Sequence, residues 1–186
     1  MTTTTTSPTR LMTIAEFEAL PEDGQKHELL WGELISVASN FRQMALTGRL
    51  VAALSTYVDE HDLGIVGPEG TFEFKTDLPL VLVPDVAFVR TENIPPQDQQ
   101  AKGNIHVVPD LVIEVISPSE TPRTIQRKST AYLGQGVRMV VIVYPERHEI
   151  TLWSSEATPR YLGREDTLDF GDVVPGFSLS LVHLFR

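Results

Sequence analysis

Two carboxylates lie inside apolar segments of this 186-residue chain, where an ionised group is costly unless a positive charge compensates it. Asp85 is the third residue of the segment Val83–Val89, and Glu114 lies near the centre of the segment Pro109–Ser117. Such apolar segments are typical of central strands in a mixed sheet, because both faces of these strands are covered. If the two strands are neighbours, their carboxylates can meet at one end of the sheet and bind a divalent cation.

Lys128 is the cation that the sequence predicts beside these carboxylates. It follows Ile125 by three residues and precedes Tyr132 by four, so it falls on the apolar stripe of a helix expected over residues 122–135. An inward lysine needs an anionic partner, and the long flexible stem of Lys128 can reach Glu114. The alternative is that its ammonium extends along the apolar surface to water.

Asp110 belongs to a second Pro-Asp pair and starts the Glu114 strand. Side chains alternate across a strand, so Asp110 is expected on the same face as Glu114. A carboxylate at the start of a strand can stay solvated. A peripheral role for Asp110 in the site therefore remains open.

The first half of the chain predicts, in order, a short capped helix from residue 13, a hairpin of strands 27–31 and 33–37, and a long helix over residues 41–60. The long helix is capped by Asn40. Its apolar positions at helical spacing are Met44, Val51, Leu54 and Val58.

The rest of the chain predicts strands at 64–66, 71–75 and 80–90, an exposed loop at 91–104, the Glu114 strand, the helix at 122–135, strands at 137–144 and 149–154, and a β-rich end comprising 160–163 and 177–185. This order indicates an α/β fold with a mixed central β-sheet flanked by helices. The N-terminal hairpin and the C-terminal β-rich edge are additions to that core.

Composition indicates a single domain over residues 11–186, preceded by a disordered leader at residues 1–10. The absence of cysteine excludes thiol chemistry and fits a cytoplasmic location. No segment approaches the roughly 18 apolar residues of a membrane span. The net charge of −10 argues against a protein coated in positive charge for nucleic-acid binding, but it leaves room for local basic faces. Cations cluster on two predicted helices, at Arg42 and Arg49 and at Arg123, Arg127 and Lys128.

Sequence motifs of nucleotide hydrolases, esterases and zinc proteases are absent. The sequence lacks a Walker-type phosphate loop, a Gly-x-Ser-x-Gly elbow and a His-Glu-x-x-His pair. The five histidines are scattered and unpaired along the sequence, which is typical of surface or turn residues.

Several segments together resemble the Uma-two family of PD-(D/E)XK endonucleases, which are restriction-endonuclease-like proteins long grouped as a domain of unknown function. They are the Asp85 and Glu114 segments, Lys128 with Tyr132 and Gly136, the opening Leu11–Phe17, the hairpin His27–Leu34 and the closing Val174–Leu179. The resemblance covers nearly the whole chain. It implies a restriction-endonuclease-like core in which Asp85 and Glu114 hold Mg²⁺ or Mn²⁺.

The resemblance also implies roles for residues around this centre. Lys128 would orient the attacking water or stabilise the phosphoryl oxygens. In the wider superfamily this lysine lies two residues after the glutamate, where this chain has Ile116, and the family commonly moves it to the following helix. Glu33 resembles an early acid of the family and would be a further metal ligand, with an exposed strand residue as the alternative.

The chain departs from the family pattern at two places. Many members carry a histidine near the start of the long helix, where this chain has Arg42 and Gln43, and members often have Trp-Leu-Val-Asp where this chain reaches Tyr144. We expect Arg42 and Gln43 to take over the substrate contact, with Arg42 on phosphate. Arg127 is a third expected substrate-binding residue.

The sequence thus predicts a metal-dependent endonuclease that hydrolyses phosphodiester bonds of DNA. The alternative is a catalytically weak or inactive module of nuclease fold that binds protein or nucleic acid. A homodimer formed through the C-terminal edge is a further expectation. Function is carried by sites rather than by folds. The geometry around Asp85 must therefore distinguish the endonuclease from the binding module.

Overall fold

A computed structural model describes residues 10–21, 23–37, 40–97, 100 and 103–186. Of the predicted leader, only Arg10 belongs to the described part of the chain. In order the elements are α1 (Ile14–Glu18), β1 (Lys26–Leu30), β2 (Glu33–Val37), α2 (Phe41–Glu60), β3 (Gly64–Gly67), β4 (Phe72–Phe74), β5 (Leu80–Leu82), β6 (Val86–Arg90), η1 (Thr91–Asn93), β7 (Leu111–Val115), α3 (Pro122–Gly134), β8 (Met139–Tyr144), β9 (Glu149–Trp153), β10 (Arg160–Leu162), β11 (Thr167–Leu168), β12 (Leu179–Ser180) and α4 (Leu181–Leu184).

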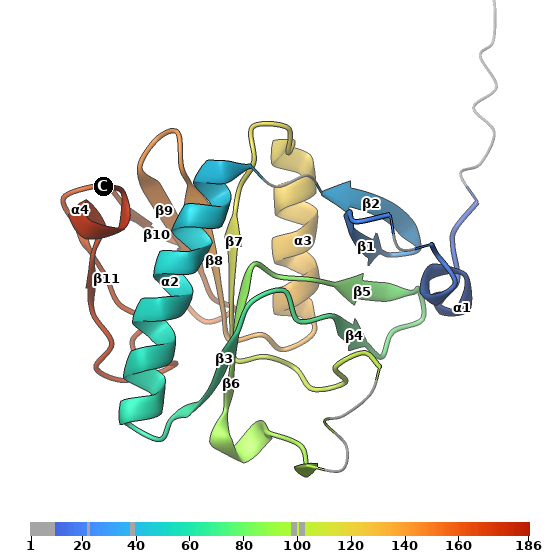
Figure 1. Ribbon diagram of the computed structural model, residues 1–186, viewed down its shortest axis with the longest axis horizontal. Coiled ribbons are helices and arrows are strands. Elements are labelled where there is room, and N and C mark those ends of the chain that lie inside the picture. Colours follow the sequence, from blue (N-terminus) through green and yellow to red (C-terminus); the bar gives the residue numbers. More distant parts are fainter. Residues whose placement is uncertain (1–9, 22, 38–39, 98–99, 101–102) are drawn as a thin grey trace, which may run out of the picture.

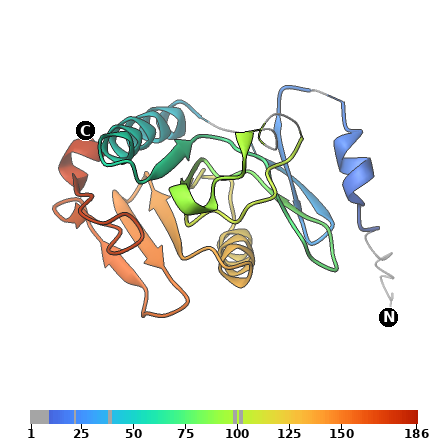
Figure 2. The ribbon, with the colours of Figure 1, turned by 90° about the horizontal axis from the view of Figure 1, so that it is seen from below.

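A six-stranded mixed sheet forms the centre of the molecule, in the order β10-β9-β8-β7-β6-β3. β7 and β8 are parallel, whereas the other neighbours are antiparallel. Helix α2 lies on one face of this sheet and α3 on the other (Figures 1 and 2). The predicted fold class, an α/β fold with a mixed sheet flanked by helices, is confirmed.

The alternation of β7 side chains separates two cores. Leu111, Ile113 and Val115 belong to the core on the α2 side. Val112 and Ile116 belong to the other core, which contains residues of α3 and of the small sheet. Glu114 lies between Val112 and Ile116 on that second face, as the period of two requires.

A four-stranded antiparallel sheet, β2-β1-β5-β4, lies beside the α3 face of the central sheet (Figure 1). Its first two strands are the predicted hairpin. Trp31 and Gly32 both have positive φ, at 56° and 79°, as a tight hairpin turn of the primed type requires. The small sheet supplies Leu30 and Leu82 to the core beneath α3.

The prediction of a single strand over residues 80–90 is wrong. The structure divides it into β5 in the small sheet and β6 in the central sheet, with Val83–Asp85 between them. Pro84 in this gap has no N–H to donate to a ladder, so the run cannot continue as one central strand. Asp85 therefore lies at the junction of the two sheets.

The predicted extended segment at 177–185 is also only partly strand. Its two-residue strand β12 pairs with β11, and the chain then turns into α4. Leu181 and Leu184 are buried at a spacing of three residues, which places both side chains on one side of a helical turn.

Candidate active site

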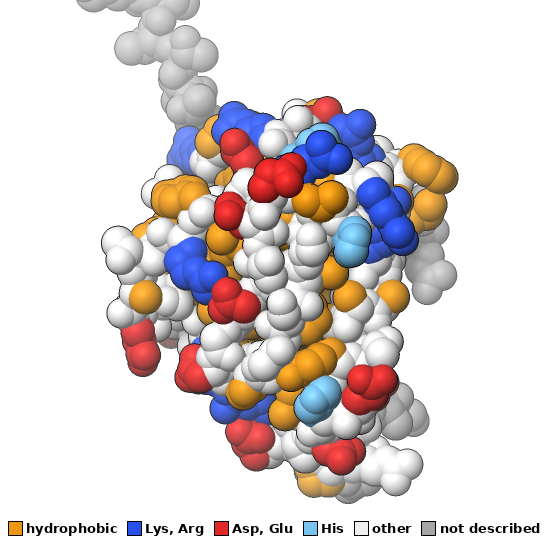
Figure 3. All heavy atoms as spheres, turned by 90° about the vertical axis from the view of Figure 1, so that its left-hand side faces the viewer, with side chains coloured by type: hydrophobic (Ala, Val, Ile, Leu, Met, Phe, Trp, Pro, Cys, Tyr) orange, Lys and Arg blue, Asp and Glu red, His pale blue; other side chains and the backbone are white. Residues whose placement is uncertain are grey.

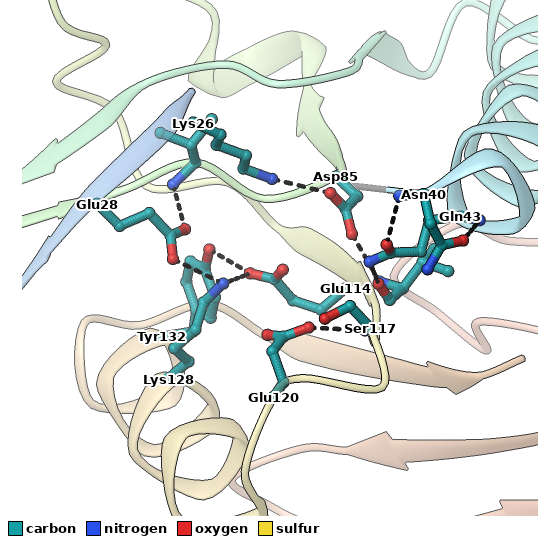
Figure 4. Close-up of polar contacts among 12 residues, drawn as sticks. Lys26, Glu28, Asn40, Gln43, Asp85, Glu114, Ser117, Glu120, Lys128 and Tyr132 are labelled. Atoms are coloured by element: carbon teal, nitrogen blue, oxygen red, sulfur yellow. Dashed lines mark hydrogen bonds and ion pairs between the residues drawn. The ribbon is translucent and has the colours of Figure 1, made fainter. Parts of the chain in front are cut away.

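Asp85 and Glu114 come together because β6 and β7 are antiparallel neighbours. The pairing of Val86 with Ile113 places Asp85 opposite Glu114. Strand β7 also holds the Asp85 carboxylate, since Oδ2 of Asp85 accepts a hydrogen bond of 2.7 Å from the Val115 backbone N–H. Two carboxylates from neighbouring strands thus lie at one end of the central sheet (Figure 4).

Lys128 joins this pair from α3. Its Nζ lies 2.8 Å from Glu114 Oε1 and 2.9 Å from Glu28 Oε2, and only 4% of its side chain is exposed. The inward orientation predicted from helical spacing is confirmed, and the alternative of an ammonium in water is wrong. Burial by itself lowers the pKa of Lys128, but the Glu114 and Glu28 carboxylates outweigh it and raise that pKa. Lys128 is therefore an ammonium at neutral pH.

Glu114 is the most perturbed acid of the cluster. Burial raises its pKa to about 7, Lys128 opposes that shift, and Glu28 and Asp85 add to it. The hydroxyl of Tyr132 donates a 2.8 Å hydrogen bond to Glu114 Oε1. Burial also raises the pKa of Tyr132 well above its usual value, so its hydroxyl keeps the donated proton. Among the described residues Oε2 of Glu114 has no hydrogen-bond partner, which leaves one carboxylate oxygen open.

Two residues of this site, Lys26 and Glu28, were missed by sequence reasoning. Both come from β1 and share one face of it, because they are two residues apart. Glu28 is fully buried and its Oε1 accepts a 2.8 Å hydrogen bond from the Val83 N–H. The Nζ of Lys26 lies 2.8 Å from Asp85 Oδ1. The only sequence signal was the position of Glu28 directly before Leu29 and Leu30, which favours a strand but does not show that the Glu28 side of this strand is buried.

The charges of the cluster explain why Lys26 stays protonated. Burial lowers the pKa of Lys26, whereas Glu114 and Asp85 raise it and Lys128 lowers it, with a raised value as the result. Three carboxylates thus face two ammonium groups. Figure 4 shows this alternation of acid and base from β1, the start of β6, β7 and α3.

Glu33 and Arg127 lie apart from the buried cluster. Glu33 is on β2, is exposed, and accepts a 2.7 Å hydrogen bond from Arg127 Nη1. That bond is the main cause of the lowered pKa of Glu33. The structure therefore brings these two predicted site residues to each other, while Glu28 of the same hairpin takes the place beside Lys128 and Glu114.

Gln43 and Arg42 differ in their relation to the site. The buried Gln43 donates a 2.7 Å hydrogen bond from Nε2 to the Val115 carbonyl, the residue whose N–H holds Asp85. Its Oε1 accepts from the Asn40 N–H at 3.0 Å and completes the capping box of α2. Arg42 is exposed at the same helical turn and lies 2.9 Å from Glu146.

Asp110 is not solvated as expected. It is buried at the opposite end of β7 from the cluster, and its Oδ2 accepts hydrogen bonds from the Arg90 N–H at 2.9 Å and from Asn93 Nδ2 at 3.1 Å. These contacts fasten η1 to β7. The position of Asp110 is therefore explained by the fold alone.

The atoms of the cluster that could bind a metal ion fit a hard divalent cation. All are carboxylate oxygens, which Mg²⁺ and Mn²⁺ prefer over nitrogen or sulfur. The buried Glu28 Oε2 is paired with the Lys128 ammonium at 2.9 Å, so the carboxylate oxygen left for a cation in this part of the cluster is Oε2 of Glu114. Within the described ranges no three His, Asp or Glu side chains form a ready ligand group. The fit is to a site of one or two carboxylates completed by water and phosphate.

A mixed sheet with an aspartate and a glutamate on adjacent strands, and a lysine beside them, is the arrangement expected of the restriction-endonuclease-like class. The chain belongs to the Uma2 family, described as “Putative restriction endonuclease”, whose sequence model matches residues 14–182. This confirms the resemblance on which the site residues were predicted, and it supports a nuclease.

A solved structure supports the same fold. A “putative nuclease belonging to DUF820” from Anabaena variabilis is similar with a TM-score of 0.82 and 20% sequence identity, over 94% of this chain and 97% of that chain. The search of curated proteins gave no match. In the described part of the chain, no helix has the length and apolar character needed to cross a membrane.

Proposed function

We propose that this protein is a divalent-metal-dependent endonuclease that hydrolyses phosphodiester bonds of DNA. Family membership supports a nuclease, and the meeting of Asp85 with Glu114 on adjacent strands is the observation that carries the metal-dependent mechanism. Asp85 and Glu114 would hold Mg²⁺ or Mn²⁺ there. The bound ion would supply Lewis-acid stabilisation of the phosphoryl oxygens and a more acidic water.

The residues of the chain contribute orientation and charge to this reaction. Water adds to phosphorus, one phosphorus–oxygen ester bond breaks, and the leaving oxygen takes up a proton. Lys128 holds Glu114 by an ion pair of 2.8 Å, and Tyr132 fixes the same oxygen, so the second carboxylate oxygen has a defined direction. Lys128 would thereby position Glu114 and add positive charge beside the reacting phosphate.

An exposed cation on the first turn of α2 supports a nucleic-acid substrate. On the face drawn in Figure 3, Lys and Arg side chains in the upper half lie among Asp and Glu side chains, so positive charge on this face is local rather than continuous. Arg42 is among the exposed residues of that first turn, next to the buried Gln43. Because the whole chain has a net charge of −10, local cations of this kind must provide the attraction for phosphate.

One observation favours the alternative of a weak or inactive binding module. Asp85 Oδ1 and Glu114 Oε1 are each already paired with a lysine. The cluster can therefore be stable as an internal ion-pair network without a metal.

Nicking of supercoiled plasmid separates the two functions. Wild type is compared with Asp85→Ala and Glu114→Ala in Mg²⁺ or Mn²⁺, with folding checked by circular dichroism and Glu33→Ala as an exposed acidic control. We expect a loss of at least about 100-fold in both cluster variants and little change in the control. A wild type that neither cleaves DNA nor RNA nor binds either ion would overturn the enzyme and favour the module.

A further inference from the structure

We propose that Lys26 is the phosphate-positioning residue of this site, and that it occupies the metal-facing oxygen of Asp85 until a divalent cation releases it. The proposal rests on the proposed nuclease function. It assigns different tasks to the two lysines of the cluster. The two lysines differ in their access to solvent.

The cluster opens to solvent at Lys26 and Asp85. Their side chains are 15% and 18% exposed, respectively. Lys128 and Glu114 are only 4% and 6% exposed, and Glu28 is fully buried. An incoming phosphate therefore meets Lys26 first, whereas Lys128 is enclosed by two carboxylates.

The two oxygens of Asp85 have different partners. Oδ2 is held by the Val115 backbone N–H, which is part of the rigid central sheet. Oδ1 faces the ammonium of Lys26 at 2.8 Å, and this lysine is on a flexible stem. Oδ1 is thus the oxygen free to coordinate a cation once Lys26 leaves. Lys26 and a metal ion compete for the same atom.

The charges of the cluster show why release of Lys26 serves the reaction. When all three acids are ionised, their three negative charges exceed the two ammonium charges, and this negative excess repels a phosphodiester. A divalent cation reverses the sign. The metal ion then replaces Lys26 as the positive partner of Asp85, and the Lys26 ammonium becomes available to a phosphate oxygen at the open side of the site.

The fixed position of the Lys26 backbone makes this exchange local. Lys26 pairs with Val37 in the β1–β2 ladder, and Glu28 on the same face of β1 is bound to the Val83 N–H. Side-chain rotation is therefore enough to move the ammonium, without displacement of β1. Glu28 and Lys128 stay in place during this rotation.

Calorimetric titration of Mn²⁺ into wild type and Lys26→Met tests the competition. Methionine keeps a similar length without the charge, and Lys75→Met at an exposed position is the matched control. We expect Mn²⁺ to bind Lys26→Met about tenfold more tightly than wild type, since a competing partly buried ion pair has been removed. The control should bind Mn²⁺ like wild type.

DNA binding and cleavage supply the second readout. At saturating Mn²⁺, Lys26→Met should cleave plasmid at least about tenfold more slowly than wild type and bind a short duplex more weakly in Ca²⁺, because the phosphate contact is missing. Lys26→Arg should retain most of the duplex binding.

The outcomes separate this inference from the proposed function. If wild type binds Mn²⁺ and cleaves DNA but Lys26→Met has unchanged or weaker metal affinity, the competition is refuted while the nuclease remains. If Lys26→Met binds metal more tightly yet cleaves and binds DNA like wild type, the phosphate role is refuted. If wild type binds no Mn²⁺, both proposals fail.

Discussion

Glu28 is fully buried and contacts both Lys128 and the segment before Asp85. Its carboxylate lies 2.9 Å from Lys128 and accepts the Val83 N–H at 2.8 Å, with no exposed area. Removal of one partner from such a buried network leaves the other charge and the donor uncompensated. The residue therefore links stability to the geometry of the candidate site.

We expect Glu28→Ala to lower the free energy of unfolding by about 3–5 kcal/mol, and Glu28→Gln by less, because the amide can still accept the Val83 N–H. Glu33→Ala, which removes an exposed ion pair in the same hairpin, should cost at most about 1 kcal/mol. Urea denaturation in EDTA measures all three. Equal losses for Glu28→Ala and Glu33→Ala would contradict the buried network.

Glu114 predicts a pH dependence of the metal-free protein. Its pKa in the folded state is raised from 4.5 to about 7, mainly by burial, so the folded state favours the protonated form. Between pH 4.5 and about pH 7, Glu114 is protonated more often in the folded chain than in the unfolded chain. The contribution of Glu114 to the free energy of unfolding therefore falls as the pH rises through this range.

The stability of wild type relative to Glu114→Gln should thus decrease from pH 5 to pH 8, by on the order of 2 kcal/mol. Urea titrations in EDTA at several pH values measure this difference. Glu33→Gln is the control, since the pKa of Glu33 is lowered rather than raised and its change falls below this range. A pH-independent difference would show that Glu114 does not titrate there.

At the scale of elements, α2 couples its own first turn to the central sheet through Gln43. The side chain closes the capping box with Asn40 and also donates to the Val115 carbonyl at 2.7 Å. We expect Gln43→Ala to cost about 2 kcal/mol, because a cap and a buried hydrogen bond are lost together. Met44→Ala next to it should cost less than about 0.5 kcal/mol, since Met44 is 59% exposed.

Thermal or urea unfolding of both variants measures this difference. Nicking activity adds a second measure, because Val115 also holds Asp85. A Gln43→Ala variant as stable as Met44→Ala would mean that the turn is held by other contacts.

Local signals in the sequence predicted most elements of the fold. Helix caps depend on residues close together in the sequence, and both N-caps, Thr13 and Asn40, and the bounds of α2 agree with the prediction. The face assignment of α2 was less successful. Met44 was expected inside but is exposed, whereas the polar Gln43 is buried, because its amide has a partner on β7. Hydrophobic periodicity cannot reveal a hydrogen bond across 72 residues of sequence.

The residues of the candidate site also differ in whether a local sequence pattern or only a tertiary contact reveals them. Asp85, Glu114 and Lys128 were recognisable because each interrupts an apolar pattern or lies on an apolar stripe. Lys26 and Glu28 are ordinary residues for the polar side of a hairpin strand. Only the pairing of β1 with β5, at Leu29 and Val81, makes β1 an inner strand and turns that side toward the cluster. That pairing is tertiary, so the sequence pattern did not report it.

For the whole molecule, the proposed function requires an acidic chain to bind an acidic polymer through a small number of local contacts. With a net charge of −10, the affinity for DNA should depend on local cations such as Arg42, and the slope of log affinity against log salt concentration should be small. Each phosphate contact contributes about −0.9 to that slope.

Arg42→Ala should make the slope less steep by about 1, whereas Arg160→Ala should leave it unchanged. Arg160 belongs to the edge strand β10 and pairs with Asp169, so it tests for a nonspecific loss of charge. Fluorescence anisotropy of a labelled duplex between low and moderate salt measures both. Equal effects of the two variants would indicate binding without a local basic face.

The division of residues 80–90 between two sheets has a consequence for the order of folding. The small sheet joins β1 with β5, and α2 and β3 lie between them in the sequence. Contacts between distant parts of a chain form after local ones, because closing a long loop costs entropy before any contact repays it. Lys26 and Glu28 would then reach Asp85, Glu114 and Lys128 among the last steps. We expect a chain whose small sheet has not yet paired to lack the complete cluster, so that the proposed cleavage would begin only when folding is complete.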